Sequence, residues 1–340
     1  MLKDPVPRQK HSPFPTLQFV PIGAGLLTLL FASVSWAQIE ITLTNTFIDT
    51  FKDRATITAT YTVDKAHAQS NPPAKDGDLH IAGRAPEIGL ATVAEIINSK
   101  FEPAAVKSIH DVEGTDTTVA ITGAWRLWCE HGGHDSQIQG APLERFTTTN
   151  PPHVFEIHPI TKIDDRDIAD GWRQIVGFQS KDAATAFAAY ENRTSQIKPG
   201  SDTTTITTNI VGYNYVEFLL KPNEEAHEID DGLQVNSNAL DLDGNPVATN
   251  RRMVFVKGTP PGDEAKNLKP GGSSLHVLGV PRIDLSLVAW RRDHATDRPD
   301  ALNWNLPYEI VIVAVYPAHA AAVGVHHRKA RTTHAAAPPS

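Results

Sequence analysis

The chain has a single cysteine, Cys129, among its 340 residues. No disulfide can form within the chain, even in an oxidising compartment, and no paired CxxC zinc motif is available. Stability must therefore come from ordinary core burial. Because Cys129 stands at the end of a strand-like run, we expect a small buried apolar residue rather than a reactive thiol.

Basic segments and catalytic signatures are also missing. The formal net charge is −8, and no basic block follows the N-terminal region. A generic nucleic-acid-binding protein would show a basic footprint, so that class is disfavoured. The sequence contains no GxSxG, P-loop, GxGxxG or HExxH motif. These absences exclude the named serine-hydrolase, nucleotide-binding and zinc-protease signatures.

The first 37 residues have the pattern of a secretory signal. Lys3, Arg8 and Lys10 precede an apolar stretch at residues 19–34, and small residues lie before Ala37. Cleavage is expected after Ala37, which predicts a secreted or periplasmic protein without an integral membrane span in the mature chain. The alternative is an uncleaved N-terminal anchor. At the other end, residues 318–340 are rich in Ala, His and Pro and predict a disordered tail.

Residues 38–163 predict a five-stranded barrel. Apolar and threonine residues alternate through residues 55–63, as in a half-buried strand. Further strands are expected before and after this run, and a short helix at residues 101–110 begins near Pro103. The expected strands lie at residues 39–63, 79–84, 91–97, 119–128 and 153–163. Three strands, a helix and two strands follow the order of an OB-fold barrel.

Two short motifs support this barrel. The segment DGDLHIAG at residues 76–83 and the segment HVFEIHPITKI from His153 resemble those of uncharacterised secreted bacterial proteins. Those proteins carry a DGD-H strand and end in a strand of the form W…[EL]HP. The resemblance covers about residues 39–165, and it implies an OB-like fold with a ligand-binding face rather than an activity.

The second half predicts another β domain. Residues 164–200 read as a connector with a short helix at 181–190, and residues 201–317 as a β-sandwich or a second barrel. Seven short strands are expected there, including residues 285–291 and the apolar run 308–316, which should be central. No internal sequence repeat relates the two halves. The predicted fold class is therefore all-β, with an OB-like barrel followed by a β-sandwich-like domain.

The alternation of side chains along the strands predicts a candidate ligand-binding face. Its residues all occupy positions on the polar side of neighbouring strands. The members are His80, Arg126, Trp128, Glu156 and His158. An aromatic beside charged groups suits stacking on a sugar ring or a base. The alternative is an internal polar network beneath the connector or the second domain.

A metal site is a separate hypothesis. His131, His134 and His153 cluster around the loop before His158, and zinc or calcium would be the ion. His153 and His158 have opposite strand parity, which argues against one shared site. The Asp76-Gly77-Asp78 turn is similar to one in thermonuclease-like OB-folds. The acidic and arginine pattern that follows in that family is absent here.

These observations predict a non-enzymatic binding module with an oligosaccharide or oligonucleotide ligand, and with a glycan or single-stranded nucleic acid as partner. The alternative is a metal-dependent, nuclease-like hydrolase that uses the region from His131 to His158. The sequence does not decide whether the protein is an enzyme, and outside the metal alternative it predicts no cofactor.

Overall fold

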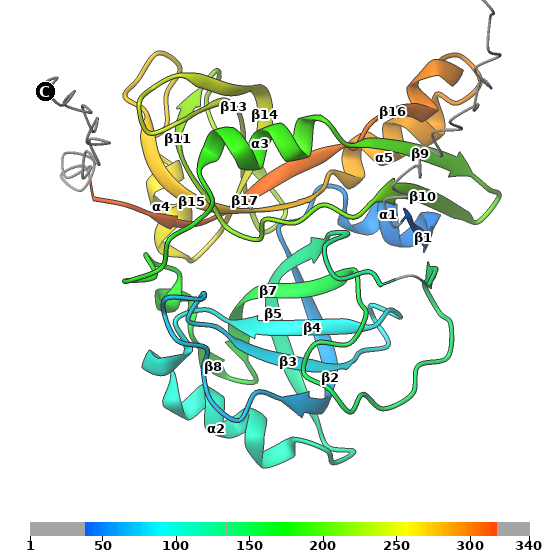
Figure 1. Cartoon of the computed structure of the whole chain (residues 1–340), viewed down its shortest axis with the longest axis vertical. Helices are drawn as coiled ribbons and strands as arrows, with labels where there is room; N and C mark the ends of the chain where they lie inside the picture. The colour runs from blue at the N-terminus through cyan, green and yellow to red at the C-terminus, as the bar shows by residue number, and fades with distance from the viewer. Residues whose placement is uncertain (1–37, 134, 318–340) are drawn as a thin grey trace, which may run out of the picture. The chain divides into compact units, whose positions relative to one another are not determined.

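The computed structural model describes residues 38–133 and 135–317. The predicted signal, His134 and the predicted tail lie outside the described residues. Among the described residues the strands form three sheets, and two of these close into five-stranded barrels (Figure 1). This confirms the prediction of an all-β fold, and both parts are barrel-like. No helix in the described ranges is long and apolar enough to cross a membrane.

Barrel 1 has the predicted OB order. Its strands are β2 (Thr56–Ala66), β3 (Leu79–Arg84), β4 (Thr92–Ile96), β5 (Thr118–Leu127) and β7 (Phe155–Ile163). The closed order is β2-β3-β4-β7-β5, and the short strand β8 (Arg166–Asp167) extends it beside β7. All neighbours are antiparallel except β4 and β7. The helix α2 (Pro103–Val112) follows the 3-10 turn Ser99–Phe101 and connects β4 to β5, as expected.

The alternation in β2 explains how barrel 1 closes. Ile57, Ala59, Tyr61 and Val63 are all buried, whereas the threonines between them are partly or fully exposed. This is the period of two expected for a strand with one side in the core. The Tyr61 hydroxyl donates to the carbonyl oxygens of Ile81 and Thr92, 2.8 and 2.9 Å away. The bonds hold β3 and the start of β4 against the barrel interior.

The second half of the chain forms a barrel rather than a β-sandwich, and we call it barrel 2. Its strands are β11 (Val216–Pro222), β13 (Gly232–Leu240), β14 (Pro246–Val256), β15 (Leu275–Ile283) and β17 (Tyr308–Val315), with β12 (His227–Ile229) at one edge. A pairing of β11 with β13 closes the sheet. The run predicted to be central, β17, lies between β14 and β15.

The two barrels share one topology. In each, the third and fifth strands pair in parallel, and a helix precedes the fourth strand; in barrel 2 this helix is α4 (Pro260–Ala265). Barrel 2 closes in the order β11-β13-β14-β17-β15, which matches barrel 1 strand for strand. The sequence shows no repeat because the topology requires only apolar residues at alternating positions, which many sequences satisfy.

A third sheet crosses the predicted segment boundaries. Its order is β16-β9-β10-β1-β6, with bounds Asn303–Asn305, Thr194–Pro199, Thr203–Asn209, Gln38–Thr44 and Gln137–Ile138. Strand β1 was expected in barrel 1, and it instead pairs along its length with β10. The helix α1 (Asn45–Phe51), capped by the Thr44 hydroxyl on the Phe47 amide, separates β1 from β2.

Two further helices lie outside the barrels' strand order. The helix predicted at residues 181–190 is α3 (Ala183–Glu191). The expected strand at residues 285–291 is wrong, because this segment is the helix α5 (Leu285–Asp293). Asp284 caps it by accepting from the Leu287 amide, and Leu285, Val288 and Ala289 are buried at helical spacing. The cap outweighs the alternation that suggested a strand. Short 3-10 turns at Ala169–Gly171 and Pro299–Leu302 complete the elements.

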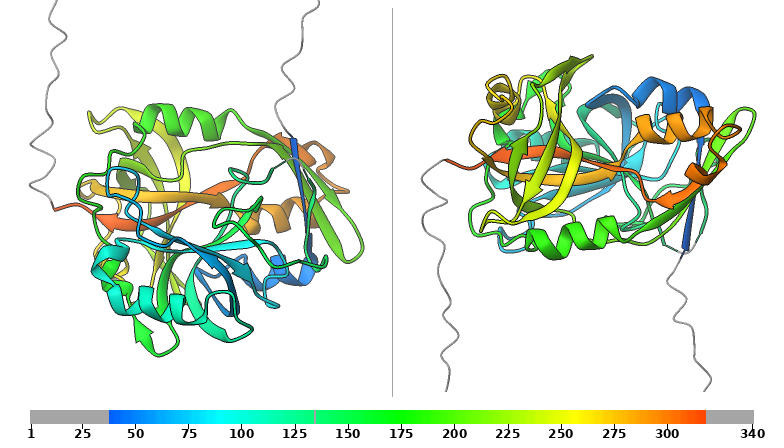
Figure 2. Two further views of the ribbon diagram at one scale, coloured as in Figure 1. Left: turned by 60° about the horizontal axis from the view of Figure 1, so that its bottom comes forward. Right: turned by 90° about the horizontal axis from the view of Figure 1, so that it is seen from above.

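The two barrels lie against each other (Figure 2), and a buried arginine joins them. Arg282 on β15 is fully buried, and its Nη atoms donate to the carbonyl oxygens of Arg54, Ala55 and Trp125 at 3.0–3.1 Å. Its Nε donates to Glu309 at 2.6 Å, and the guanidinium lies 3.6 Å from the centre of the Trp125 ring. Barrel 2 therefore covers one side of barrel 1 with directional contacts.

Candidate functional site: an acid–histidine cluster on barrel 1

The register of barrel 1 brings three polar side chains into a row. His80 on β3 is the direct partner of Glu95 on β4. The parallel pairing of β4 with β7 sets Ala94 opposite Ile157, so the next position along each strand is Glu95 beside His158. Asp78 precedes His80 by two residues and lies on the same side. We call Asp78, His80, Glu95 and His158 the acid–histidine cluster.

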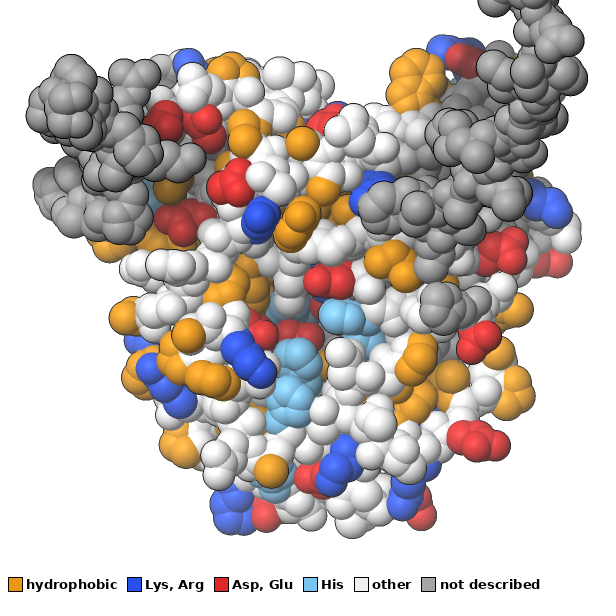
Figure 3. Space-filling model, in the orientation of Figure 1, with side chains coloured by type: hydrophobic (Ala, Val, Ile, Leu, Met, Phe, Trp, Pro, Cys, Tyr) orange, Lys and Arg blue, Asp and Glu red, His pale blue; other side chains and the backbone are white. Residues whose placement is uncertain are grey.

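Distances within the cluster are short. Glu95 Oε2 lies 3.6 Å from His80 Nε2 and 3.5 Å from His158 Nε2. His158 Nε2 is also 3.4 Å from Asp78 Oδ2. Asp78, Glu95 and His158 are buried, and each offers one ligand atom within 4.8 Å of the others. Figure 3 shows histidine side chains gathered beside acidic ones near the middle of the face in view.

A tyrosine at the entrance to barrel 2 closes the cluster on one side. The Tyr215 hydroxyl donates to Asp78 Oδ2 at 2.7 Å and accepts from His158 Nε2 at 2.7 Å. His158 Nδ1 lies 3.3 Å from Glu156 Oε2. His158 is thus held from both ring nitrogens, and Nε2 points toward the two carboxylates.

Burial and neighbouring charge shift the protonation of the cluster. Burial alone would lower the pKa of His158, but Glu95, Asp78 and Glu156 raise it to about 10. Burial raises the pKa of the Asp78 carboxyl against the opposing effect of His158. For His80, burial is outweighed by Glu95 and Asp76, and its pKa is raised. The cluster therefore attracts positive charge, either protons or a cation.

Arg126 and Glu156 form a second pair next to the cluster. They are direct partners across β5 and β7, and Arg126 Nη1 donates to Glu156 Oε2 at 2.5 Å. Arg126 also donates to Glu130 at 3.2 Å and to the Pro281 carbonyl of barrel 2 at 3.0 Å. Although burial acts the other way, Arg126 holds the pKa of Glu156 well below its usual range. Each of the three guanidinium nitrogens of Arg126 thus donates to a partner inside the protein.

The predicted ligand-binding residues are brought together, but their face is covered. Arg126 and His158 are fully buried, Trp128 is 2% exposed and Glu156 is 3% exposed. The Trp128 ring packs edge-on against Tyr190 of α3, with centroids 5.5 Å apart. The expectation of an exposed Trp128 platform is therefore wrong. The alternative reading, a polar network beneath the connector and second domain, matches the burial. Only His80 keeps a partly exposed side chain, at 16%.

The predicted histidine metal site does not form as a cluster in the described residues. His131 and His153 stack with ring centroids 5.1 Å apart. His153 Nδ1 donates to the Pro151 carbonyl at 2.7 Å, and Nε2 lies 3.3 Å from Glu156 Oε1. His134 lies outside the described residues. The metal-type cluster is formed instead by His158 with acids on β4 and before β3.

Sequence reasoning missed Glu95 and Tyr215. Glu95 carries the only charge in the apolar run of residues 90–97, and a lone carboxylate in such a run is a usable signal. Pairing that strand with the one bearing His80 would have placed the two side by side. Tyr215 lies next to the first strand of barrel 2, and no local sequence pattern indicates its contact with the cluster.

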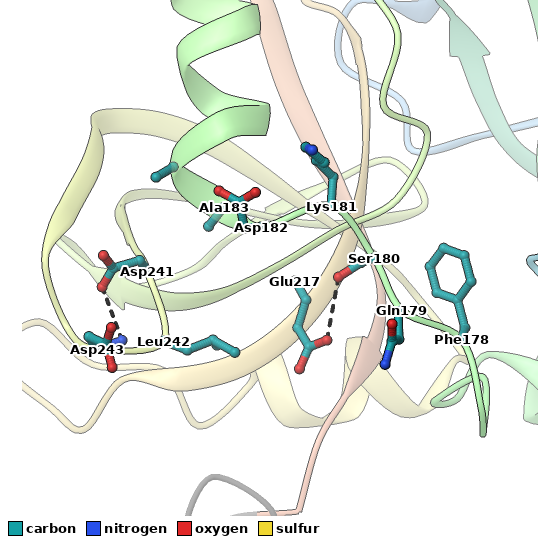
Figure 4. A pocket seen from close by; sticks show the side chains of 11 residues that line it. Phe178, Gln179, Ser180, Lys181, Asp182, Ala183, Glu217, Asp241, Leu242 and Asp243 are labelled. Carbon is teal, nitrogen blue, oxygen red and sulfur yellow. Dashed lines mark hydrogen bonds between the residues drawn. The ribbon is translucent and has the colours of Figure 1, made fainter. Parts of the chain in front are cut away.

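A cavity on barrel 2 is another place where a ligand could lie (Figure 4). Its volume is about 490 Å³, and it is lined by residues 178–184, Glu217 and residues 241–243. Several of its polar groups already have partners: Ser180 donates to Glu217, and Asp182 caps α3. Asp241 accepts the Asp243 and Asn245 amides in a tight turn. More of the polar groups in this cavity than in the cluster therefore already have hydrogen-bond partners.

Comparisons with known proteins identify no family. No protein-family model matches the chain, and no curated protein matches it. Among solved structures, it is similar to a chain of a replication protein A heterotrimer bound to single-stranded DNA, with 9% identity. The match covers 66% of this chain and 45% of that chain, with a TM-score of 0.18. The chain thus spans less than half of that structure's chain, and a TM-score this low does not indicate a common arrangement.

Proposed function

We propose that this chain is a non-enzymatic binding module of the secreted or periplasmic space, with its ligand site at the acid–histidine cluster of barrel 1. The observation that carries the proposal is a group of buried polar atoms without hydrogen-bond partners. Asp78 Oδ1, His80 Nε2 and Glu95 Oε2 all belong to it. Buried polar atoms normally have partners, so a ligand is the natural completion of this group. In OB-folds the face of the second and third strands commonly binds ligands, and His80 and Glu95 lie on those strands.

The charge of the site limits the ligand class. Asp76, Asp78 and Glu95 surround His80, and Arg126 is occupied by Glu156 and Glu130. A polyanion such as single-stranded DNA would meet carboxylates rather than a basic groove. With Trp128 buried, an aromatic platform for a sugar ring is also absent at this position. A small cationic or hydrogen-bonding ligand fits the site better than either polymer.

A metal-dependent hydrolase is the second candidate. Its support is the combination of His158 with two carboxylates, the residue types that metal-assisted hydrolysis uses. Against it stands the burial of Asp78, Glu95 and His158 beneath Tyr215. A polymeric substrate would reach these atoms only if that segment moved. Binding of a small ligand requires no entry of a polymer, so it accounts for the geometry more simply than catalysis.

A thermal-shift panel tests the proposed function. Full-length protein is stripped with a chelator and then mixed with a thymidine homopolymer, chito-oligosaccharides, polyamines or divalent-metal chlorides. Ligand binding to the folded state raises Tm by mass action. We expect one of the small cationic ligands to raise the Tm of the wild type and not of Glu95→Gln. A matched control is Glu264→Gln, a carboxylate on α4 far from the cluster in sequence and outside barrel 1. A panel in which no ligand distinguishes Glu95→Gln from the wild type contradicts the proposal.

A further inference from the structure

We propose that the acid–histidine cluster binds one divalent transition-metal ion, with zinc the best match, through Asp78, Glu95, His80 and His158. This inference rests on the ligand site proposed above and names its ligand. The donor set is two imidazole nitrogens and two carboxylates, all from strands of barrel 1 or the residue that precedes them. Zinc binds such nitrogen and oxygen donors in four-coordinate sites, whereas calcium and magnesium prefer oxygen donors alone.

The separations between Glu95 and the two histidines match edges of a tetrahedral site. Zinc bonds to His nitrogen and carboxylate oxygen are about 2.0–2.2 Å long, so the edges of a tetrahedron around the ion are about 3.3–3.6 Å. Glu95 Oε2 lies 3.5 Å from His158 Nε2 and 3.6 Å from His80 Nε2. These contacts are longer than good hydrogen bonds and close to the edges of a coordination polyhedron.

Free coordination capacity lies at the centre of the cluster. Asp78 is 0% exposed and Glu95 is 2% exposed, yet Asp78 Oδ1 and Glu95 Oε2 have no hydrogen-bond partner. Asp78 can ligate through Oδ1 while Oδ2 keeps its bond to the Tyr215 hydroxyl. The buried Glu309 of barrel 2 provides a contrast, because both its oxygens accept from arginines. An acid that serves only the fold is fully partnered here.

Charge also favours a divalent cation. Buried carboxylates need a positive partner, and Asp78 and Glu95 have only His80 and His158, whose positive charge a bound ion would replace. The guanidinium of Arg126 is already engaged, because Glu156 and Glu130 accept from it. A doubly charged ion would neutralise both carboxylates at once.

The surroundings orient the ligands in the manner of other metal sites. Glu156 Oε2 lies 3.3 Å from His158 Nδ1, an outer-shell carboxylate that turns Nε2 toward the cluster. His67 stacks on His80 with centroids 4.6 Å apart and fixes the plane of that ring. Because the His80 side chain is 16% exposed, it provides an entry path for an ion. For ligation, His158 Nε2 must exchange its contact with the Tyr215 hydroxyl for the metal.

Calorimetric titration of chelator-stripped, full-length protein with zinc chloride tests the site. We expect one strong equivalent in the wild type. In Glu95→Gln, which keeps the shape of the side chain, we expect the affinity to fall by at least about a hundredfold, since losing a ligand should exceed the effect of losing an outer-shell partner. His131→Gln is the matched control, and its affinity should equal that of the wild type. Tail histidines are present in all three proteins, so the difference between them isolates the cluster.

A second measurement keeps the test valid if Glu95→Gln does not fold. Cobalt(II) added to the wild type should give the intense visible absorption of a tetrahedral site, and one equivalent of zinc should remove it. Equal binding by all variants, or loss of binding only in His131→Gln, would overturn the inference. So would a wild type that binds no metal. In that last case a polyamine that shifts the Tm of the wild type but not of Glu95→Gln would leave the broader proposed function standing.

Discussion

Trp128 shows how burial changes the reading of a single residue. Its ring packs against Tyr190 at 5.5 Å and is 2% exposed, so it serves packing rather than ligand stacking. We expect Trp128→Ala to lower the free energy of unfolding by about 3–5 kcal/mol, as for other buried aromatics. Urea denaturation measures this loss. Trp304→Ala is the control, because that side chain is 54% exposed, and it should cost no more than about 0.5 kcal/mol. Equal effects of the two changes would contradict the assignment.

Cys129 is a second residue whose chemistry follows from burial. Burial raises the pKa of its thiol to about 12, and the thiol lies 3.5 Å from the Asn209 carbonyl. Since the thiolate is the reactive form, we expect no alkylation by iodoacetamide at mildly alkaline pH in the native protein. Mass spectrometry should find one adduct after denaturation in guanidinium chloride. Stoichiometric labelling of the folded protein would show the thiol to be accessible.

The candidate site was predictable only in part. Parity along each strand correctly placed His80, Glu156 and His158 on the side of the barrel where the cluster forms, because side chains alternate with a period of two. Parity does not say what covers that side. Tyr215 and Tyr190 cover that side, and both lie more than 100 residues after His80 in the chain. No local sequence pattern indicates such contacts.

At the scale of elements, Gly123 lets β5 approach the bend of β7 next to His158. A Cβ at position 123 would lie 2.5 Å from the Pro159 carbonyl oxygen and 2.7 Å from Ile157 Cγ2. We expect Gly123→Ala to cost about 1–3 kcal/mol by overpacking and to weaken metal binding by displacing His158. Thermal unfolding and zinc titration measure the two effects. Gly171→Ala is the control, since its Cβ would meet only ordinary contacts of 3.5 Å or more. Unchanged stability and affinity in Gly123→Ala would refute this account.

The strands of barrel 1 were predictable because local signals agree. In β2 the alternation and the β-branched residues both favour a strand, and α2 begins at Pro103 as expected. Where local signals conflict, tertiary contacts decide. Strand β1 has the same threonine-rich alternation as β2, yet it pairs with β10, 159 or more residues later. At α5 a second local signal, the Asp284 cap, makes a helix despite a strand-like pattern. The choice of pairing partner depends on the whole chain.

At the scale of the whole molecule, Arg282 couples the barrels. Its replacement by leucine would leave three carbonyl oxygens of barrel 1 without their donor and weaken the partnering of buried Glu309. Breaking a buried pair of this kind costs about 3–5 kcal/mol. Because the lost contacts join the barrels, we expect one unfolding transition in the wild type and two in Arg282→Leu.

The control for this change is Arg251→Leu. Arg251 also pairs with a glutamate, Glu191, and lies over the Tyr308 ring at 5.0 Å, but these partners belong to α3 and barrel 2. Calorimetry of this variant should show a lower Tm and one transition. A single transition in Arg282→Leu as well would show that other contacts suffice to couple the barrels.

The most direct test of the central claim is to locate the ion. Crystals of the full-length protein grown with zinc chloride, with diffraction recorded at the zinc absorption edge, would give an anomalous difference map. The account predicts one strong peak about 2.0–2.2 Å from donor atoms of Asp78, His80, Glu95 and His158. A map with no peak there, or with a peak only beside His131 and His153, would contradict it.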